Sequence, residues 1–176
     1  MKKNSVRKLV LASMFLAIGF VLPMITGQIK QIGQMLLPMH LPVMLCGLIC
    51  GPSYGAAVGL LLPFARSVVF GMPPLYPNAV WMSLELTTYG LIIGLIYKLL
   101  KKQNTLCVTV SLLAAMLSGR IVWGIAKAIL LGLGGKKFGF SMFIAGGFTE
   151  AIPGIILQLI LIPAIMMLVN RKEQTQ

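Results

Sequence analysis

The stretch Val6–Thr26, which reads VRKLVLASMFLAIGFVLPMIT, decides the class of fold. After Arg7 and Lys8 it is almost entirely apolar, and it is as long as a helix that crosses a bilayer, which takes about 20 residues. The apolar run lacks a clear small-x-small cleavage site and is followed by further apolar segments. We therefore interpret it as a retained membrane helix and not as a signal peptide.

The composition of the whole chain agrees with this interpretation. Hydrophobic residues make up 58% of the 176 residues and charged residues only 10%, whereas a soluble domain carries about a quarter charged residues. So few polar groups cannot cover so much apolar surface, and lipid must cover the rest. The sequence predicts an all-α membrane protein with a single integral membrane domain, residues 1–176.

Breaks of polar, glycine and proline residues divide the chain into six predicted transmembrane helices. The second is short and has Pro38 and Pro42 near its start, so we expect it to be buried or tilted. Glycines at 51, 55 and 59 predict a close helix contact on the third. The predicted helices cover residues 6–26, 37–50, 52–71, 78–100, 106–133 and 140–170.

The distribution of lysine and arginine predicts the orientation of the bundle. An even number of helices places both termini on one side, and most basic residues of the short loops then lie on that side. We therefore expect cytoplasmic N- and C-termini in a bacterial cell membrane. The basic residues on the cytoplasmic side are Lys2, Lys3, Arg7, Lys8, Lys98, Lys101, Lys102, Arg171 and Lys172, against Lys30, Lys136 and Lys137 outside.

The residue types and their spacing disfavour several functions. The formal charge of +12 is not arranged with aromatic residues along an exposed face, as a nucleic-acid site requires. Cys46, Cys50, Cys107 and His40 do not form a metal-ligand pattern, and intramembrane catalysis lacks its residues because the chain has no aspartate. The glycines before Lys136 do not match a phosphate-binding loop. We expect no enzyme activity, no metal and no cofactor in this chain.

Charged residues inside the apolar helices are the best candidates for function, because a charge in the membrane is costly. Depths estimated at 1.5 Å per residue place four of them in one layer, roughly 8 to 15 Å below the outer helix ends, with a fifth deeper at roughly 20 Å. The layer consists of Arg66, Glu85, Lys127 and Glu150, and the deeper residue is Arg120.

Aromatic and polar residues share helical faces with these charges. Asn78 and Trp81 fall on the stripe of Glu85, and Trp123 falls between Arg120 and Lys127. Convergent polar groups among aromatic walls predict a small-molecule pocket. With Arg120 included, the three basic and two acidic residues leave one net positive charge, which favours an anionic group on the ligand. The alternative is that Glu85 and Glu150 only neutralise basic residues as structural ion pairs. The predicted pocket residues are Arg66, Asn78, Trp81, Glu85, Trp123, Lys127 and Glu150.

Three stretches resemble a known family. The chain begins its first helix with Arg7–Ala12, continues with Gly33–Val43 (GQMLLPMHLPV), and has the segment Gly71–Pro74 (GMPP) before the fourth helix. Together with the six-helix basic chain, they resemble the substrate-binding S component of an energy-coupling factor (ECF) vitamin transporter.

This resemblance implies a function and partners. The chain would capture a vitamin or vitamin-like nutrient near the outer side of the membrane, beneath lid segments at residues 28–34 and 72–76. Its partners would be a membrane coupling subunit, contacted at Ser13 and Ala17, and two cytoplasmic subunits that hydrolyse ATP. A small structural membrane protein, whose charges bind helices together, and a self-sufficient secondary transporter remain alternatives, although the two halves show no convincing self-similarity.

Overall fold

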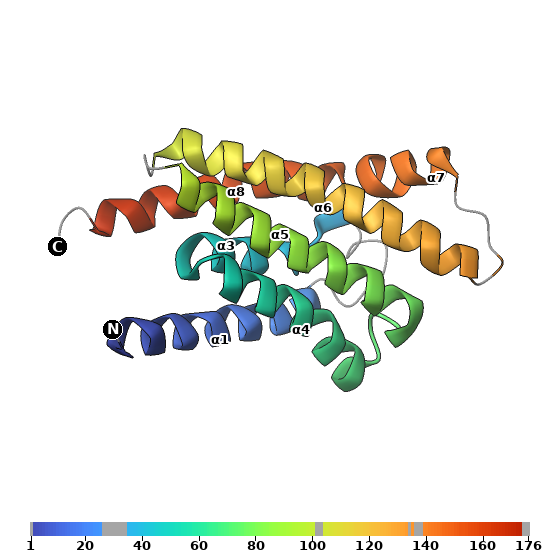
Figure 1. Ribbon diagram of the computed structural model, residues 1–176, viewed down its shortest axis with the longest axis horizontal. Coiled ribbons are helices and arrows are strands. Elements are labelled where there is room, and N and C mark those ends of the chain that lie inside the picture. The colour runs from blue at the N-terminus through green and yellow to red at the C-terminus, as the bar shows by residue number, and fades with distance from the viewer. Residues whose placement is uncertain (1, 26–34, 101–103, 134, 136–138, 174–176) are drawn as a thin grey trace.

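The computed structural model describes residues 2–25, 35–100, 104–133, 135 and 139–173, and these residues form helices joined by short connections, without a strand. Figure 1 shows them as an elongated bundle in which the long helices run along the longest axis. The elements are α1 (Lys2–Ile25), α3 (His40–Cys50), α4 (Pro52–Phe70), η1 (Leu75–Ala79), α5 (Val80–Leu99), α6 (Thr105–Leu133), α7 (Phe140–Ile144), η2 (Ala145–Thr149) and α8 (Ile152–Glu173).

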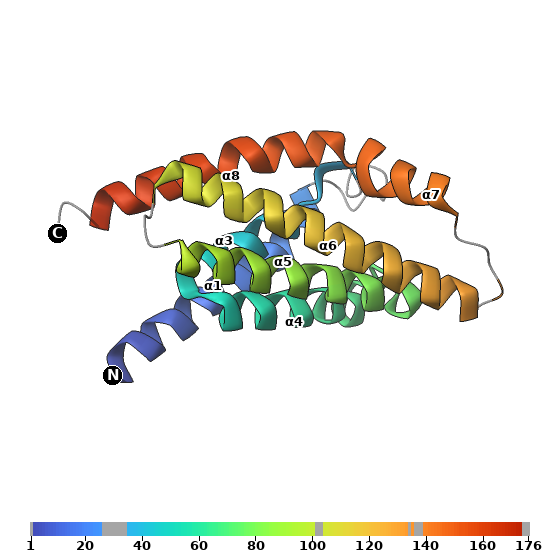
Figure 2. The ribbon, with the colours of Figure 1, turned by 45° about the horizontal axis from the view of Figure 1, so that its top comes forward.

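Five helical segments in the described part of the chain are long and apolar enough to cross a membrane. This confirms a multi-pass all-α membrane protein. The start of α1 and the end of α8 lie at the same end of the bundle in Figures 1 and 2, which we call the terminal end. The five segments are Ser5–Met24, Pro52–Phe70, Leu75–Leu99, Thr105–Leu133 and Ile152–Asn170.

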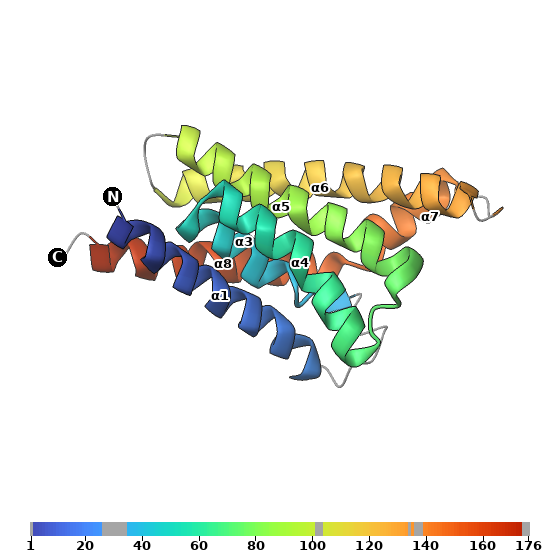
Figure 3. The same cartoon turned by 60° about the horizontal axis from the view of Figure 1, so that its bottom comes forward.

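The second predicted helix is shorter than expected and does not cross the bundle. A helix of 11 residues, as in α3, is about 16 Å long, roughly half the hydrocarbon core. It begins at His40 and not at Leu37, because Leu37 adopts a left-handed backbone conformation (φ 49°). Figure 3 shows α3 in the half of the bundle nearest the terminal end. Its first turn therefore lies near the middle of the bundle.

The last predicted helix, 140–170, is also not continuous. It consists of α7, the wide turn η2 and, after a break at Glu150 and Ala151, α8. The amide of Glu150 bonds to the carbonyl of Ala145, one residue further back than in a regular helix (2.9 Å). Pro153 causes part of the break, because its ring excludes a regular helix through the preceding turn. Gly146 and Gly147 add to it because glycine favours helix weakly.

Glycines bring α3, α4 and α5 into close contact at the centre of the bundle. A Cβ atom at Gly55 would lie 2.6 Å from Gly47 Cα, and a Cβ at Gly59 or Gly90 would collide with the backbone of the facing helix. Gly55 and Gly59 therefore form the predicted close-contact face. Gly51 does not belong to it: nothing lies near it, and its φ of 104° lets the chain turn between α3 and α4.

Candidate functional site

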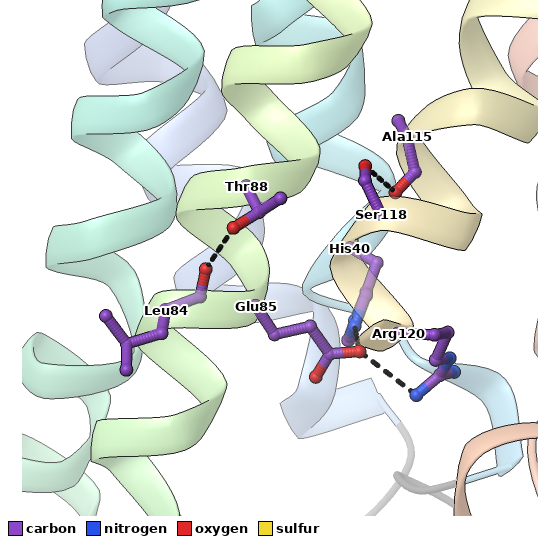
Figure 4. A network of polar contacts seen from close by, with 7 residues as sticks. All are labelled: His40, Leu84, Glu85, Thr88, Ala115, Ser118 and Arg120. Atoms are coloured by element: carbon purple, nitrogen blue, oxygen red, sulfur yellow. Dashed lines mark hydrogen bonds and ion pairs between the residues drawn. The ribbon is translucent and has the colours of Figure 1, made fainter. Parts of the chain in front are cut away.

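Four polar residues meet in the middle of the bundle, and we call them the inner cluster: His40, Glu85, Tyr89 and Arg120. Nη1 of Arg120 on α6 donates a hydrogen bond to Oε1 of Glu85 on α5 (3.0 Å). Nε2 of His40, the first residue of α3, lies 3.4 Å from the same oxygen (Figure 4). All three side chains are at most 5% exposed. The Glu85 carboxylate thus joins three separate helices.

Tyr89 completes the inner cluster one turn along α5 from Glu85. Its ring meets the His40 ring edge-on, with the two centroids 5.1 Å apart, and Tyr89 is itself buried, at 2% exposure. Gly119 makes room for this ring, because a Cβ there would lie 2.8 Å from it. Residues that are far apart in the sequence therefore pack around the buried carboxylate of Glu85.

Neighbouring hydroxyl groups are already used within their own helices. Figure 4 shows Thr88 donating to the carbonyl of Leu84 (2.8 Å) and Ser118 donating to that of Ala115 (3.0 Å). A hydroxyl that bonds back along its helix has given its one hydrogen to the backbone. Neither hydroxyl therefore donates to the Glu85 carboxylate.

A second group of residues lies further from the terminal end, and we call it the outer cluster: Trp81, Trp123 and Lys127. The Lys127 Nζ lies 4.5 Å from the centroid of the Trp123 ring and 5.7 Å from that of Trp81. Both distances are within the range of a cation–π interaction. Lys127 follows Arg120 by about 10 Å along α6, at 1.5 Å per residue.

Trp123 borders both clusters. Arg120 precedes Trp123 by one turn of α6, and its Cζ lies 5.9 Å from the Trp123 ring centroid. Lys127 follows Trp123 by one turn and contacts the same ring. Trp123 is only 7% exposed. A flat ligand against this ring would therefore have a cation of α6 within reach on either side.

The wide turn η2 packs onto Trp123. A Cβ atom at Gly146 would lie 3.2 Å from the indole, and one at Gly147 would lie 3.4 Å from it. Phe143 of α7 adds a ring contact, with centroids 6.1 Å apart. The break in the last predicted helix therefore supplies bare backbone where the indole needs space.

Other predicted site residues lie elsewhere. Arg66 on α4 faces α1, donates a hydrogen bond to the Phe20 carbonyl, and has Cζ 5.1 Å from the Phe70 ring centroid. Asn78 is half-buried in η1, and Glu150 is exposed at the break before α8. The structure brings together Glu85 with Arg120, and Trp81 with Trp123 and Lys127. A ligand role for each predicted residue stays a prediction.

The estimate that Arg120 lies deeper than Glu85 was wrong, because their side chains are hydrogen-bonded to each other. Glu85 lies about 21 Å from the end of α5 at Leu99, and Arg120 lies about 22 Å from the start of α6 at Thr105, at 1.5 Å per residue. The two residues are therefore level. The estimate failed because it was measured from the outer helix ends, and α6 extends further there than α5.

Two buried polar residues, His40 and Gln158, were not among the predicted pocket residues, although Gln158 follows Glu150 by about two turns near the same helical face. His40, the one histidine of the chain, was considered only as a metal ligand and set aside. Its position at the start of a half-length helix was the signal, because such a helix begins inside the membrane. Gln158 of α8 is 1% exposed, and a buried amide in an apolar helix is a comparable signal.

The two residues predicted to contact a coupling subunit lie on the surface of α1. Ser13 and Ala17 are exposed on α1, next to exposed apolar residues such as Met14 and Ile18. Ser13 donates its hydroxyl hydrogen to the Leu9 carbonyl (3.0 Å), so the face is less polar than its sequence suggests.

Within the described ranges, no three His, Cys, Asp or Glu side chains converge as metal ligands would.

Comparisons with known proteins gave one match. The family described as "ECF transporter, substrate-specific component" matches residues 7–166, nearly the whole chain. Searches among curated proteins and among solved structures found no significant match.

Proposed function

The chain belongs to the family of ECF transporter substrate-specific components, and on this premise we propose that it captures a vitamin or vitamin-like micronutrient and carries it inward. The observation that supports this most is Trp123, an almost fully buried indole bordered by two cations and covered by the glycines of η2. Aromatic walls with a few charged groups are typical of small-ligand sites.

The outer cluster suits a flat nutrient with a negative or electron-rich group. An aromatic ring stacks on Trp123 or Trp81, and the Lys127 ammonium pairs with an anionic substituent. Lys127 lies over both indoles before any ligand arrives, so it is held close to where such a substituent would be. We include Asn78 and Glu150, at the edges of this region, and Arg66 among the residues for mutation.

The proposed partners are a membrane coupling subunit and two cytoplasmic ATPase subunits, which supply the energy that this chain does not. The exposed small residues Ser13 and Ala17 on α1 offer a face on which another helix can pack closely. The ends that carry Arg7, Lys8 and Lys98 lie at the terminal end of the bundle. If that end is cytoplasmic, as these basic residues favour, the outer cluster lies toward the outside of a bacterial cell membrane.

The test is a titration of the purified chain, in detergent or nanodiscs, with a panel of water-soluble vitamins. The chain has two tryptophans, and both belong to the outer cluster, so tryptophan emission, excited selectively over the tyrosines, reports on this region. We expect one vitamin to change the emission saturably. Lys127→Met should weaken its binding about tenfold or more, the equivalent of about 1.4 kcal/mol.

Lys98→Met is the matched control, because Lys98 is exposed near the far end of α5. It removes the same charge but should leave the affinity unchanged. If no vitamin alters the emission, or if both lysine variants weaken binding equally, the outer cluster is not the substrate site.

A further inference from the structure

The inner cluster holds more hydrogen-bond donors than its own residues use. Nη1 of Arg120 bonds to Glu85, but Nη2 has no hydrogen-bond partner among the residues that the structure describes. Both ring nitrogens of His40 also lack a hydrogen bond there, since Nε2 is near Glu85 but not aligned with it. A neutral imidazole still needs a partner for its N–H. One carboxylate does not satisfy this set.

A further unpartnered donor lies on α8, a helix that packs against α3 and α6. Gln158 is 1% exposed, and its Nε2 has no partner in the described part of the chain. A Cβ at Gly154, one turn earlier on α8, would lie 2.6 Å from the Met35 carbonyl oxygen. From that contact α8 and the segment leading into α3 both run toward the terminal end (Figures 1 and 2). Gln158 lies one turn further along α8 than this contact, and α8 packs against α3.

The backbone at the start of α3 adds to the unpartnered hydrogen-bond donors. The first turn of α3 lies at the middle of the bundle, and no side chain caps it. The His40 amide donates to the Leu37 carbonyl (3.0 Å) and Pro42 has no amide hydrogen, so Leu41 has the one amide of this turn without a partner within the helix. At this depth water is scarce and an unpartnered donor is costly. Donor groups of Arg120, His40 and Gln158 thus lack an acceptor among the described residues.

These observations identify the missing partner by its chemistry. We propose that the inner cluster is the deep end of the substrate site and that it binds an oxygen acceptor of the substrate, a carboxylate or a carbonyl. The ring of the substrate then lies against Trp123, which is in contact with Arg120. The inference rests on the proposed function and adds the class of substrate: an aromatic nutrient with an acceptor group at its buried end.

The two terminal nitrogens of Arg120 then have separate roles. Nη1 keeps the Glu85 carboxylate neutralised, while Nη2 is left for the substrate. Glu85 then positions Arg120 and is not itself a substrate contact. A lysine in place of Arg120 would retain one charge near Glu85 but would lose the forked geometry that serves two acceptors at once.

The experiment starts from the vitamin that changes tryptophan emission in the panel described above. Its affinity is compared with that of an analogue in which the carboxylate or carbonyl is replaced by a methyl or methylene group. The comparison is made for the natural sequence, Arg120→Lys and Gln158→Leu. Ser111→Ala is the control, because Ser111 is a buried polar residue of α6 whose hydroxyl bonds to the Cys107 carbonyl of its own helix.

We expect the analogue to bind at least tenfold more weakly than the vitamin to the natural sequence and to Ser111→Ala. In Arg120→Lys and Gln158→Leu the two ligands should differ less than threefold, because the vitamin loses affinity and the analogue does not. Apparent melting temperatures without ligand confirm that each variant is folded.

Other outcomes separate the two proposals. If a vitamin binds but lacks an acceptor, or if the analogue binds equally well, the acceptor site is wrong and the proposed function stands. The same conclusion follows if both variants keep the full difference between the two ligands. If no vitamin in the panel binds, the proposed function itself is wrong.

Discussion

Glu85 is the residue on which the interior of the bundle depends most. A carboxylate buried to 3% exposure in a membrane protein is tolerated only when it is paired and hydrogen-bonded. Arg120 of α6 supplies the counter-charge and a hydrogen bond, and His40 of α3 lies 3.4 Å from the same oxygen. Since Arg120 comes from a separate helix, the charge is neutralised only when α5 and α6 are assembled.

The first prediction concerns this pairing. Glu85→Gln leaves the Arg120 guanidinium buried without a counter-charge, which should destabilise the protein by about 3 kcal/mol. The apparent melting temperature of the detergent-solubilised chain measures this effect. The double variant Glu85→Gln with Arg120→Met removes both charges, and it should recover much of the loss.

The double variant also decides between a paired and an unpaired Glu85. If its melting temperature falls by the sum of the two single effects, then Glu85 and Arg120 do not interact in the protein. Ser111→Ala should change the melting temperature little, which would show that not every buried polar residue of α6 behaves in this way.

At the scale of the elements, two interrupted helices meet at the site. The segment before α3 and the break before α8 both place irregular backbone inside the bundle, where a membrane protein tolerates it only against protein or a cavity. Prolines and glycines in the sequence indicate both interruptions: Pro38 and Pro42 near the start of α3, and Gly146, Gly147 and Pro153 near the break before α8. Hydropathy alone cannot locate such breaks, because their residues are as apolar as those of a continuous helix.

The crossing of α4 and α5 gives the second prediction. A Cβ at Gly59 or Gly90 would collide with backbone atoms of the facing helix, which cannot move aside as a flexible side chain can. Gly59→Ala and Gly90→Ala should each destabilise the bundle by about 2 kcal/mol. Gly132→Ala is the control, because nothing lies within 4 Å of that Cβ. A uniform small gain in melting temperature for all three would contradict the close contact.

The third prediction concerns η2. Gly146→Val adds two methyl groups beyond a Cβ that already lies 3.2 Å from the Trp123 indole, so the indole must shift. We expect a shift in tryptophan emission and at least a tenfold loss of affinity for the vitamin. Gly139→Val, at a position with open space, should change neither. Unaltered binding by Gly146→Val would show that η2 does not shape the site.

At the scale of the whole molecule, hydropathy predicted the membrane class and the positions of α1, α4, α5 and α6 to within a few residues. It did so because crossing a bilayer imposes a minimum length that is visible in one sequence. The pairing of Glu85 with Arg120 was not visible, since it depends on how far each helix extends beyond the other. His40 was missed because its importance arises from contacts with Glu85 and Tyr89 of α5, far along the chain.

The fourth prediction concerns the partners. Ala17→Leu, or Ser13→Leu, places a large side chain on the small-residue face of α1 and should prevent close approach of a coupling subunit. Capture of the ATPase subunits by the tagged chain from its native membrane should fall at least tenfold. Vitamin affinity should stay unchanged, since both residues are exposed and distant from Trp123. Undiminished capture by both variants would place the contact elsewhere.

The central claim, that this chain binds a small nutrient, is tested most directly by native mass spectrometry of the protein extracted gently from its own membrane. The prediction is one nutrient-sized molecule per chain, carrying an aromatic ring, that is lost from the Lys127→Met variant and retained by Lys98→Met. A chain that releases only lipid, and that stays bare after incubation with the vitamin panel, would contradict the account.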